Sequence, residues 1–133
     1  MVLTARLYLA GHSTEIEGIP LLTCNFKFKQ EIDERGLVKS KVAGGEIKLS
    51  FNSMDDEEIM WWMFSEQSDK NGKIEFSGEE GEKIFKTVEF KDAFCVAYHE
   101  SFVRDVEMIQ EITISTREIT LSGATFTNVW NRY

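Results

Sequence analysis

The feature of this sequence that most constrains its fold is a run of six apolar residues, IMWWMF, at positions 59–64. Four acidic residues at positions 55–58 precede the run. They favour a helix start because the helix dipole stabilises negative charge in the first turn. Ser53 lies three residues before Asp56, in a pattern similar to a capping box. We therefore predict a short helix that begins near Ser53, and we interpret the acids as a helix start rather than as a metal site.

A helix with six consecutive apolar residues is apolar on every face, because successive residues advance by about 100° around its axis. A single small domain offers such a helix only one core side. The other side then needs a second surface, and another copy of the same chain would supply it. We expect Trp61 and Trp62 to lie at or beside such a subunit interface. The alternative is that both are interior, since aromatic side chains bury large areas in any case.

Most of the remaining chain has the pattern of β-strands. Apolar and polar residues alternate most clearly over residues 22–29, where Leu22, Cys24, Phe26 and Phe28 are expected inside the fold. Similar patterns predict further strands at residues 5–10, 46–51, 73–76, 86–90, 93–99, 112–115 and 119–121.

Turns and composition complete the fold prediction. The pair Asn71-Gly72 predicts a tight hairpin turn, and residues 78–81 predict a second turn. The chain has a single proline, Pro20, and no low-complexity linker that would mark a domain boundary. We expect one domain over residues 1–133: mainly β, a compact β-barrel or sandwich of about eight strands with one short α-helix.

Charge and hydropathy exclude several classes of function. The chain has 133 residues and a formal net charge of -8, which argues against nucleic acid as a partner. The longest apolar run is six residues, too short for a membrane-spanning helix, so no membrane insertion is expected. The N-terminus has no apolar signal core, which predicts cytoplasmic synthesis without Sec-type export. Residues 1–50 carry a net charge of +1 and residues 51–133 a net charge of -9, an asymmetry that suits head-to-tail contacts.

The sequence contains no recognisable catalytic or metal-binding motif. Phosphate-loop, dinucleotide-binding, zinc-protease and CxxC patterns are absent. His12 and His99 are far apart in the sequence, and each is interpreted as a structural residue. Cys24 and Cys95 fall in alternating strand patterns and are interpreted as small buried hydrophobic residues. We therefore expect no enzymatic activity, no cofactor and no metal, and a protein that binds or builds.

An ordered series of segments resembles one protein family. It begins with SKVAGGEI at residues 40–47, SMDD at residues 53–56 and the pair Trp62-Met63. It continues with KIEF at residues 73–76, VEFKDAFCV at residues 88–96 and ITISTREI at residues 112–119. Together these resemble the type VI secretion system tube protein (TssD, or Hcp) of Bacteroidetes-type systems. The C-terminal residues 125–133 match only loosely, through Asn128 and Trp130.

The resemblance implies a compact β-barrel with one helix, related to phage tail-tube proteins. Six copies would form a ring, and rings would stack head-to-tail into a hollow tube. A contractile sheath would drive the tube and its tip spike into a target cell, and some effectors would travel inside the ring. The chain would therefore be made in the cytoplasm and then secreted through the type VI apparatus without a signal peptide.

The resemblance also implies roles for particular residues. The loop at residues 31–45 would reach the adjacent ring, with an acidic surface such as Glu79, Glu80 and Glu82 as its partner and with Gly44-Gly45 as a flexible end. The polar side of residues 22–29 would face the tube lumen or the outer surface. The residues expected to stack rings are Arg35, Gly36, Lys39, Ser40, Lys41, Val42, Gly44 and Gly45. Those expected on the lumen face are Thr23, Asn25, Lys27 and Lys29.

Three alternatives remain at this stage. The first is a cytoplasmic carrier, a β-barrel that encloses a small apolar ligand among its ten Phe and three Trp residues. The second is a small hydrolase with paired carboxylates, for which no nucleophile or metal pattern is found. The third is the tube protein of a related contractile injection particle, which would share both fold and assembly.

Overall fold

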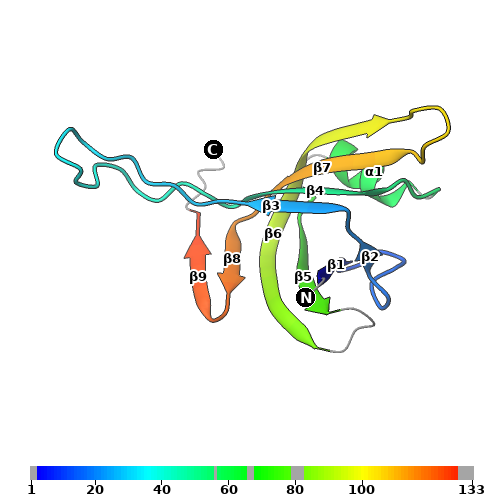
Figure 1. The fold of residues 1–133 in the computed structure, drawn as a ribbon, viewed down its shortest axis with the longest axis horizontal. Helices are drawn as coiled ribbons and strands as arrows, with labels where there is room; N and C mark the ends of the chain where they lie inside the picture. Colours follow the sequence, from blue (N-terminus) through cyan, green and yellow to red (C-terminus); the bar gives the residue numbers. More distant parts are fainter. Residues whose placement is uncertain (1–2, 56, 66–67, 79–82, 129–133) are drawn as a thin grey trace.

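The computed structural model describes residues 3–55, 57–65, 68–78 and 83–128. The described chain contains nine β-strands and one short α-helix (Figure 1), which confirms the prediction of a mainly β fold. In chain order the elements are β1 (Leu3–Leu9), β2 (Ile19–Pro20), β3 (Thr23–Phe26), β4 (Glu46–Asn52), α1 (Glu58–Phe64), β5 (Lys70–Gly78), β6 (Ile84–Ser101), β7 (Ile109–Ser115), β8 (Glu118–Leu121) and β9 (Ala124–Thr127).

The nine described strands form one antiparallel sheet whose two parts, the first and the second sheet, share β6. The first sheet has the order β2-β1-β5-β6-β8-β9, and the second has the order β3-β4-β7-β6. The first half of β6 pairs with β5 and β8, and its second half pairs with β7. The strand curves between the two sheets (Figure 1), and Asp92 stands at the change of sheet with a positive φ of 53°.

The barrel is closed on its other side by the chain from β2 to β3. The backbone N–H of Leu21 donates to the carbonyl of Ala5 in the first sheet, at 2.9 Å. The next N–H, that of Leu22, donates to the carbonyl of Ser50 in the second sheet, at 2.8 Å. Two consecutive residues therefore connect the two sheets, and the crossing leaves the Leu22 side chain 52% exposed. The expectation that Leu22 lies inside the fold was wrong.

The interior of the barrel is filled by side chains from both sheets. Phe51 and Ile74 are fully buried, and Phe90 is 2% exposed. Cys24, Phe26 and Phe28, predicted on the inner side, are partly buried and pack against this core. A filled interior gives no support to the alternative of a barrel that carries an enclosed ligand.

Two local predictions were wrong, and a third falls mostly outside the described residues. The two strands expected at residues 86–90 and 93–99 are one continuous strand, β6. The pair Asn71-Gly72 lies inside β5 rather than in a hairpin turn. An added Cβ at Gly72 would lie 2.6 Å from the ring of Phe90, so this glycine permits a close side-chain approach. The turn expected at residues 78–81 falls mostly outside the described residues.

The helix begins later than predicted. It starts at Glu58, and the N-cap residue Glu57 makes no side-chain capping hydrogen bond. Ser53 instead donates its hydroxyl to Glu100 at 2.7 Å, and its backbone N–H donates to Met108 at 3.0 Å. The capping role predicted for Ser53 was therefore wrong, because β4–β7 pairing continues to that residue. Asp56 lies outside the described residues.

Candidate assembly surfaces

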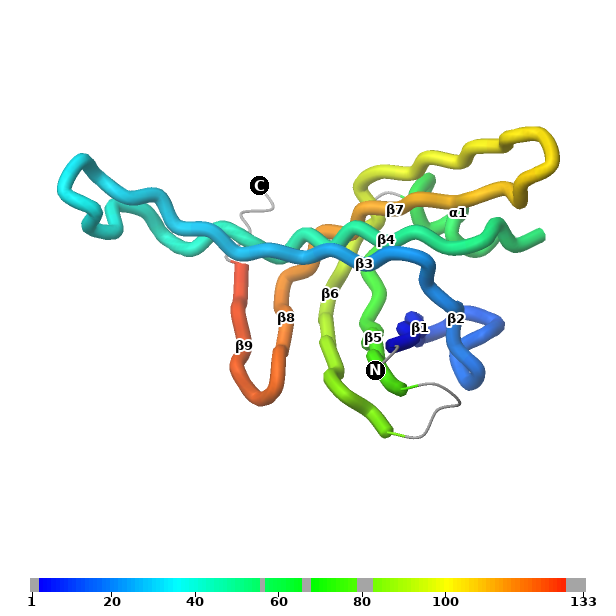
Figure 2. Tube along the Cα trace, viewed as in Figure 1, coloured from blue at the N-terminus to red at the C-terminus, as the bar shows by residue number. Residues whose placement is uncertain are grey.

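A long hairpin arm, residues 27–45, extends from one end of the molecule between β3 and β4 (Figure 2). Its two sides are joined by a pair of backbone hydrogen bonds between Lys29 and Ala43, at 2.8 and 2.7 Å. At the tip, a carboxylate oxygen of Asp33 accepts the backbone N–H groups of Arg35 and Leu37, each at 2.9 Å. The segment predicted as a loop is therefore an ordered hairpin with a side-chain-stabilised turn.

The base of the arm is fixed by its two glycines. Gly45 is buried and has a φ of +93°, and its carbonyl accepts both the backbone N–H and the hydroxyl of Thr116 at 2.8 Å. The side-chain amide of Asn128 donates to the carbonyls of Gly44 and Thr116, at 3.1 and 3.0 Å. An added Cβ at Gly44 would lie 2.3 Å from the ring of Phe28. The expectation of a flexible pair was therefore wrong, because the glycines permit close packing.

The arm leaves apolar side chains uncovered. Ile32, Leu37 and Val38 are 57–60% exposed beyond the barrel wall. Exposed apolar side chains on a projecting element make the arm a candidate contact site. Among the residues predicted to stack rings, Arg35, Gly36, Lys39, Lys41 and Val42 are exposed, Ser40 and Gly44 are half-buried, and Gly45 is buried.

The helix α1 divides its aromatic residues between the core and the surface. Trp62 is 3% exposed, and its indole N–H donates to the carbonyl of Ser68 at 3.1 Å. Trp61 and Phe64 are 64% and 67% exposed. Of the two tryptophans predicted at a subunit interface, the structure therefore places Trp62 in the core and leaves Trp61 available to a partner.

The polar side of β3 belongs to a wider polar face of the second sheet. Thr23, Asn25, Lys27 and Lys29, the predicted lumen set, are all exposed. By strand register, Thr23 aligns with Ser50, Glu111 and His99 across the sheet. The hydroxyls of Thr23 and Ser50 lie 2.5 Å apart, and His99 Nδ1 lies 3.6 Å from Glu111 Oε2.

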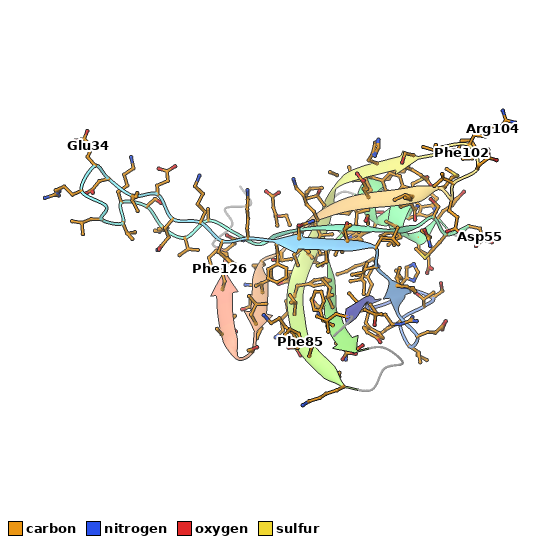
Figure 3. All side chains as sticks on the ribbon, viewed as in Figure 1. Glu34, Asp55, Phe85, Phe102, Arg104 and Phe126 are labelled. Atoms are coloured by element: carbon orange, nitrogen blue, oxygen red, sulfur yellow. The ribbon has the colours of Figure 1, made fainter. Side chains whose placement is uncertain are left out.

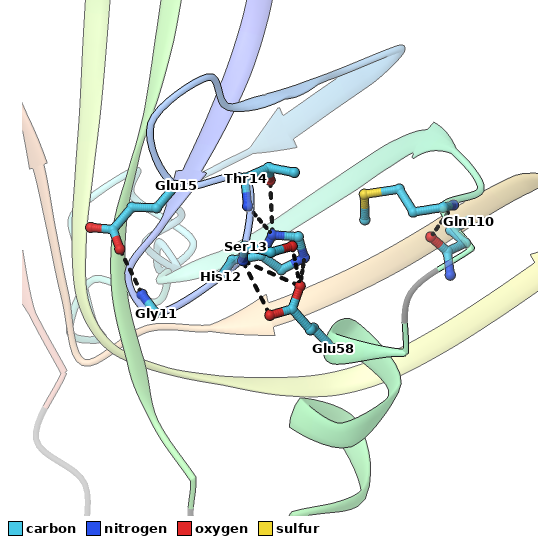
Figure 4. A network of polar contacts seen from close by, with 8 residues as sticks. Gly11, His12, Ser13, Thr14, Glu15, Glu58 and Gln110 are labelled. Carbon is cyan, nitrogen blue, oxygen red and sulfur yellow. Dashed lines mark hydrogen bonds and ion pairs between the residues drawn. The ribbon is translucent and has the colours of Figure 1, made fainter.

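The helix is connected to the turn after β1 by a polar network (Figure 4). His12 is buried, and its Nε2 atom lies 3.3 Å from Glu58 Oε2. Ser13 donates both its hydroxyl and its backbone N–H to the same carboxylate, at 2.5 and 3.1 Å. The hydrogen bond from the Ser13 hydroxyl is the main reason why the pKa of Glu58 lies below its ordinary value. The buried His12 therefore connects the turn after β1 to the first residue of the helix.

The two cysteines are poor candidates for chemistry. Cys95 is buried and Cys24 is half-buried, and burial raises the pKa of each thiol to about 11. Within the described residues, no group of three or more potential metal ligands comes together. In the same part of the chain, no helix has the length and apolar character needed to cross a membrane.

The fold is a β-barrel with a projecting hairpin arm. The family described as hemolysin coregulated protein Hcp (TssD) matches residues 1–131, so the chain belongs to this family. It is a structural tube subunit rather than an enzyme, and proteins of this family are secreted through type VI systems. No curated protein matches the sequence significantly.

Solved structures agree with this assignment. The chain is similar to Hcp1 from Flavobacterium johnsoniae, with 25% sequence identity, a TM-score of 0.85, and coverage of 94% of this chain and 99% of that chain. It shares the fold of Hcp1 from Salmonella typhimurium, with 13% identity, a TM-score of 0.72, and coverage of 96% and 93%. It also shares the fold of a chain in the PVC sheath-tube complex of an extracellular contractile injection system, with 17% identity, a TM-score of 0.57, and coverage of 92% and 88%.

Proposed function

We propose that this chain forms six-membered rings that stack head-to-tail into the inner tube of a type VI secretion system. The observation that carries the proposal is the arm at residues 27–45, which is ordered, projects beyond the barrel and exposes apolar side chains. The exposed apolar side chains of the arm do not stabilise a monomer, because apolar surface is unfavourable in water until a partner covers it. Membership of the Hcp family supports the tube as that partner.

Each predicted surface takes one role in this assembly. Trp61 on α1 contacts the neighbouring subunit within a ring. The arm, with Arg35, Lys39 and Lys41, contacts the adjacent ring. The polar face that contains Asn25 lines the lumen, where effectors are carried. A contractile sheath surrounds the tube, and a spike closes its tip; the similarity to a chain of a sheath-tube complex supports the sheath as a partner.

A tube protein of a related contractile injection particle is a second candidate. The similarity to a chain of an extracellular contractile injection system favours this second candidate, because that chain has the same fold. Both candidates predict the same ring and tube, and they differ only in the particle to which the tube belongs. The greater structural similarity to an Hcp1 protein favours the type VI system.

Electron microscopy and light scattering of the purified protein test the proposal. We expect six-fold rings and, at high concentration, stacked tubes. A variant that combines Arg35→Glu, Lys39→Glu and Lys41→Glu should form rings but no tubes, because the exposed cations lie on the arm and away from the barrel. A matched variant with Lys86→Glu and Lys91→Glu on β6 should form both. A protein that remains monomeric at every concentration would exclude the proposal.

A further inference from the structure

We propose that the arm of one copy docks on the opposite end of a second copy of this chain, against residues 102–108 and the neighbouring residues 53–55 and 57. This inference rests on the proposed function, because it names the surface that receives the arm when rings stack. The acidic surface expected from the sequence at Glu79, Glu80 and Glu82 lies outside the described residues.

The first observation is the position of the two surfaces. Figure 3 shows Glu34 at the tip of the arm and Phe102 at the other end of the long axis. Asp55 lies at the same end as Phe102 in that view, and the backbone hydrogen bond from Ser53 to Met108 joins the two receiving segments. A contact between opposite ends of identical chains is heterologous, and repetition of such a contact gives an open filament or tube.

The second observation is that both ends expose apolar side chains. On the arm these are Leu37 and Val38, each 57% exposed. On the receiving end, Phe102 is 66% exposed, Val103 is 60% exposed and Val106 is 55% exposed. Exposed apolar residues at two separate ends stabilise nothing within one chain, but they can cover each other between chains. The aromatic ring of Phe102 offers the largest contact area.

The third observation is charge complementarity. The returning side of the arm, residues 37–43, contains Lys39 and Lys41 and no carboxylate. The receiving end contains the acids Asp55 and Glu57, and it adds Asp105 and Glu107 beside a single cation, Arg104. Opposite charges around an apolar centre orient a contact and suppress like-with-like pairing of the same ends. The charges therefore favour the arm on this end over the arm on another arm.

Crosslinking tests the contact. In a variant that carries Val38→Cys and Val103→Cys, the new thiols lie at opposite ends of one chain, so a short bis-maleimide can join them only between copies. Burial raises the pKa of the native Cys24 and Cys95 thiols to about 11, which keeps their background reaction low. The single variants are controls, and so is Val38→Cys combined with Glu89→Cys in the middle of the first sheet.

Contacts between rings predict a ladder of covalent oligomers that continues beyond six chains on a denaturing gel. Contacts within a ring would stop the ladder at six, and this result would overturn the inference. Micrographs of the same sample separate the two proposals. Tubes without the ladder would overturn only this docking surface, whereas the absence of tubes from wild-type protein would overturn the stacking itself.

If the cysteine variant fails to assemble, charge-reversal variants test the same contact between the arm and the receiving end. Lys39→Glu with Lys41→Glu should abolish tubes, and Asp105→Lys with Glu107→Lys should do the same. A chain with all four substitutions should regain tubes, because each contact then pairs the reversed charges. Failure of the fourfold variant to regain tubes, while its rings remain intact, would overturn the inference.

Discussion

The Nε2 atom of His12 lies 3.3 Å from the Oε2 atom of Glu58, which joins the turn after β1 to the first residue of α1. The helix has only seven residues, too few to be stable by itself in water. Its position therefore depends on tertiary contacts. The carboxylate of Glu58 makes the polar contacts among them. Ser13 adds two hydrogen bonds to the same carboxylate.

We predict that Glu58→Gln lowers the free energy of unfolding at pH 7. The side chain of Glu58 is 38% exposed. Solvent screening therefore limits the loss to about 1 kcal/mol. Since hydrogen bonds from Ser13 lower the pKa of Glu58 in the folded state, its contribution is complete above the unfolded pKa near 4.5. That contribution is lost as the pH falls through the lower folded value.

Urea unfolding of both proteins between pH 7 and pH 3 measures this effect. The gap in stability between wild type and Glu58→Gln should be constant down to about pH 4.5 and should narrow below it. Glu57→Gln is the matched control, because it removes a neighbouring acid that makes no capping hydrogen bond. Equal losses for the two variants would contradict the role of the network.

The glycine at the base of the arm should be far more sensitive to substitution than the glycine at its tip. Gly45 and Gly36 both have a positive φ, +93° and +85°, so alanine is strained at either position. At Gly45 the new Cβ would also lie 2.3 Å from Asn128 Nδ2 and 3.0 Å from the Thr116 carbonyl, whereas nothing lies within 4 Å at Gly36.

We therefore expect Gly36→Ala to cost about 1 kcal/mol and Gly45→Ala to cost at least about 2 kcal/mol in the free energy of unfolding. Chemical denaturation measures both values. Asn128→Ala removes the facing amide and should relieve part of the Gly45→Ala penalty in the double variant. If the two alanine variants are equally stable, the arm is not anchored at its base as described.

The sequence predicted the fold class well because strand periodicity is a local signal. Residues 46–51 alternate strictly, and the structure has β4 at Glu46–Asn52. The bend of β6 has no such local signal in the sequence. Asp92 adopts a positive φ without glycine, and contacts distant in sequence hold it there: its backbone N–H donates to Asn71 at 2.9 Å, and its carboxylate accepts from Arg117 at 2.6 Å.

The assembly surfaces were predicted only in part, for a related physical reason. Exposed apolar residues on the arm are visible in the sequence, but whether they are covered depends on the tertiary fold. Trp61 and Trp62 are adjacent and chemically identical, and only the packing of α1 separates the buried one from the exposed one. Asn128 carries no local signal for its role, because its partners Gly44 and Thr116 are brought to it by the sheet.

The two tryptophans should respond to alanine in opposite ways. Trp62→Ala should lower the free energy of unfolding by about 3 to 5 kcal/mol, because it opens a cavity in the core. Trp61→Ala should change it by less than about 0.5 kcal/mol, since its side chain faces solvent in the single chain. Its effect should instead be a shift from rings to smaller species in sedimentation velocity. If Trp61→Ala still forms intact rings at low protein concentration, the prediction that Trp61 lies at the subunit interface is wrong.

The polar face of the second sheet should be hidden from large reagents once tubes form. We expect a maleimide carried on a polymer too large to enter the tube to label Asn25→Cys in dissociated protein but not in tubes. A small maleimide should label it in both, because tube ends are open to small molecules. Burial raises the pKa of the Cys24 and Cys95 thiols to about 11, so few of them are thiolates at pH 7 and the new cysteine dominates the signal.

Glu89→Cys is the matched control, because Glu89 is exposed on the first sheet, away from the polar face. It reports whether tubes block the large reagent everywhere or only at Asn25. Protection at Asn25 with access at Glu89 places the row of Thr23, Ser50 and Glu111 in the lumen, where cargo would meet a wet, charged wall. Rapid labelling of Asn25→Cys in intact tubes would place this face outside, against the sheath, and the lumen would then be lined by another part of the barrel.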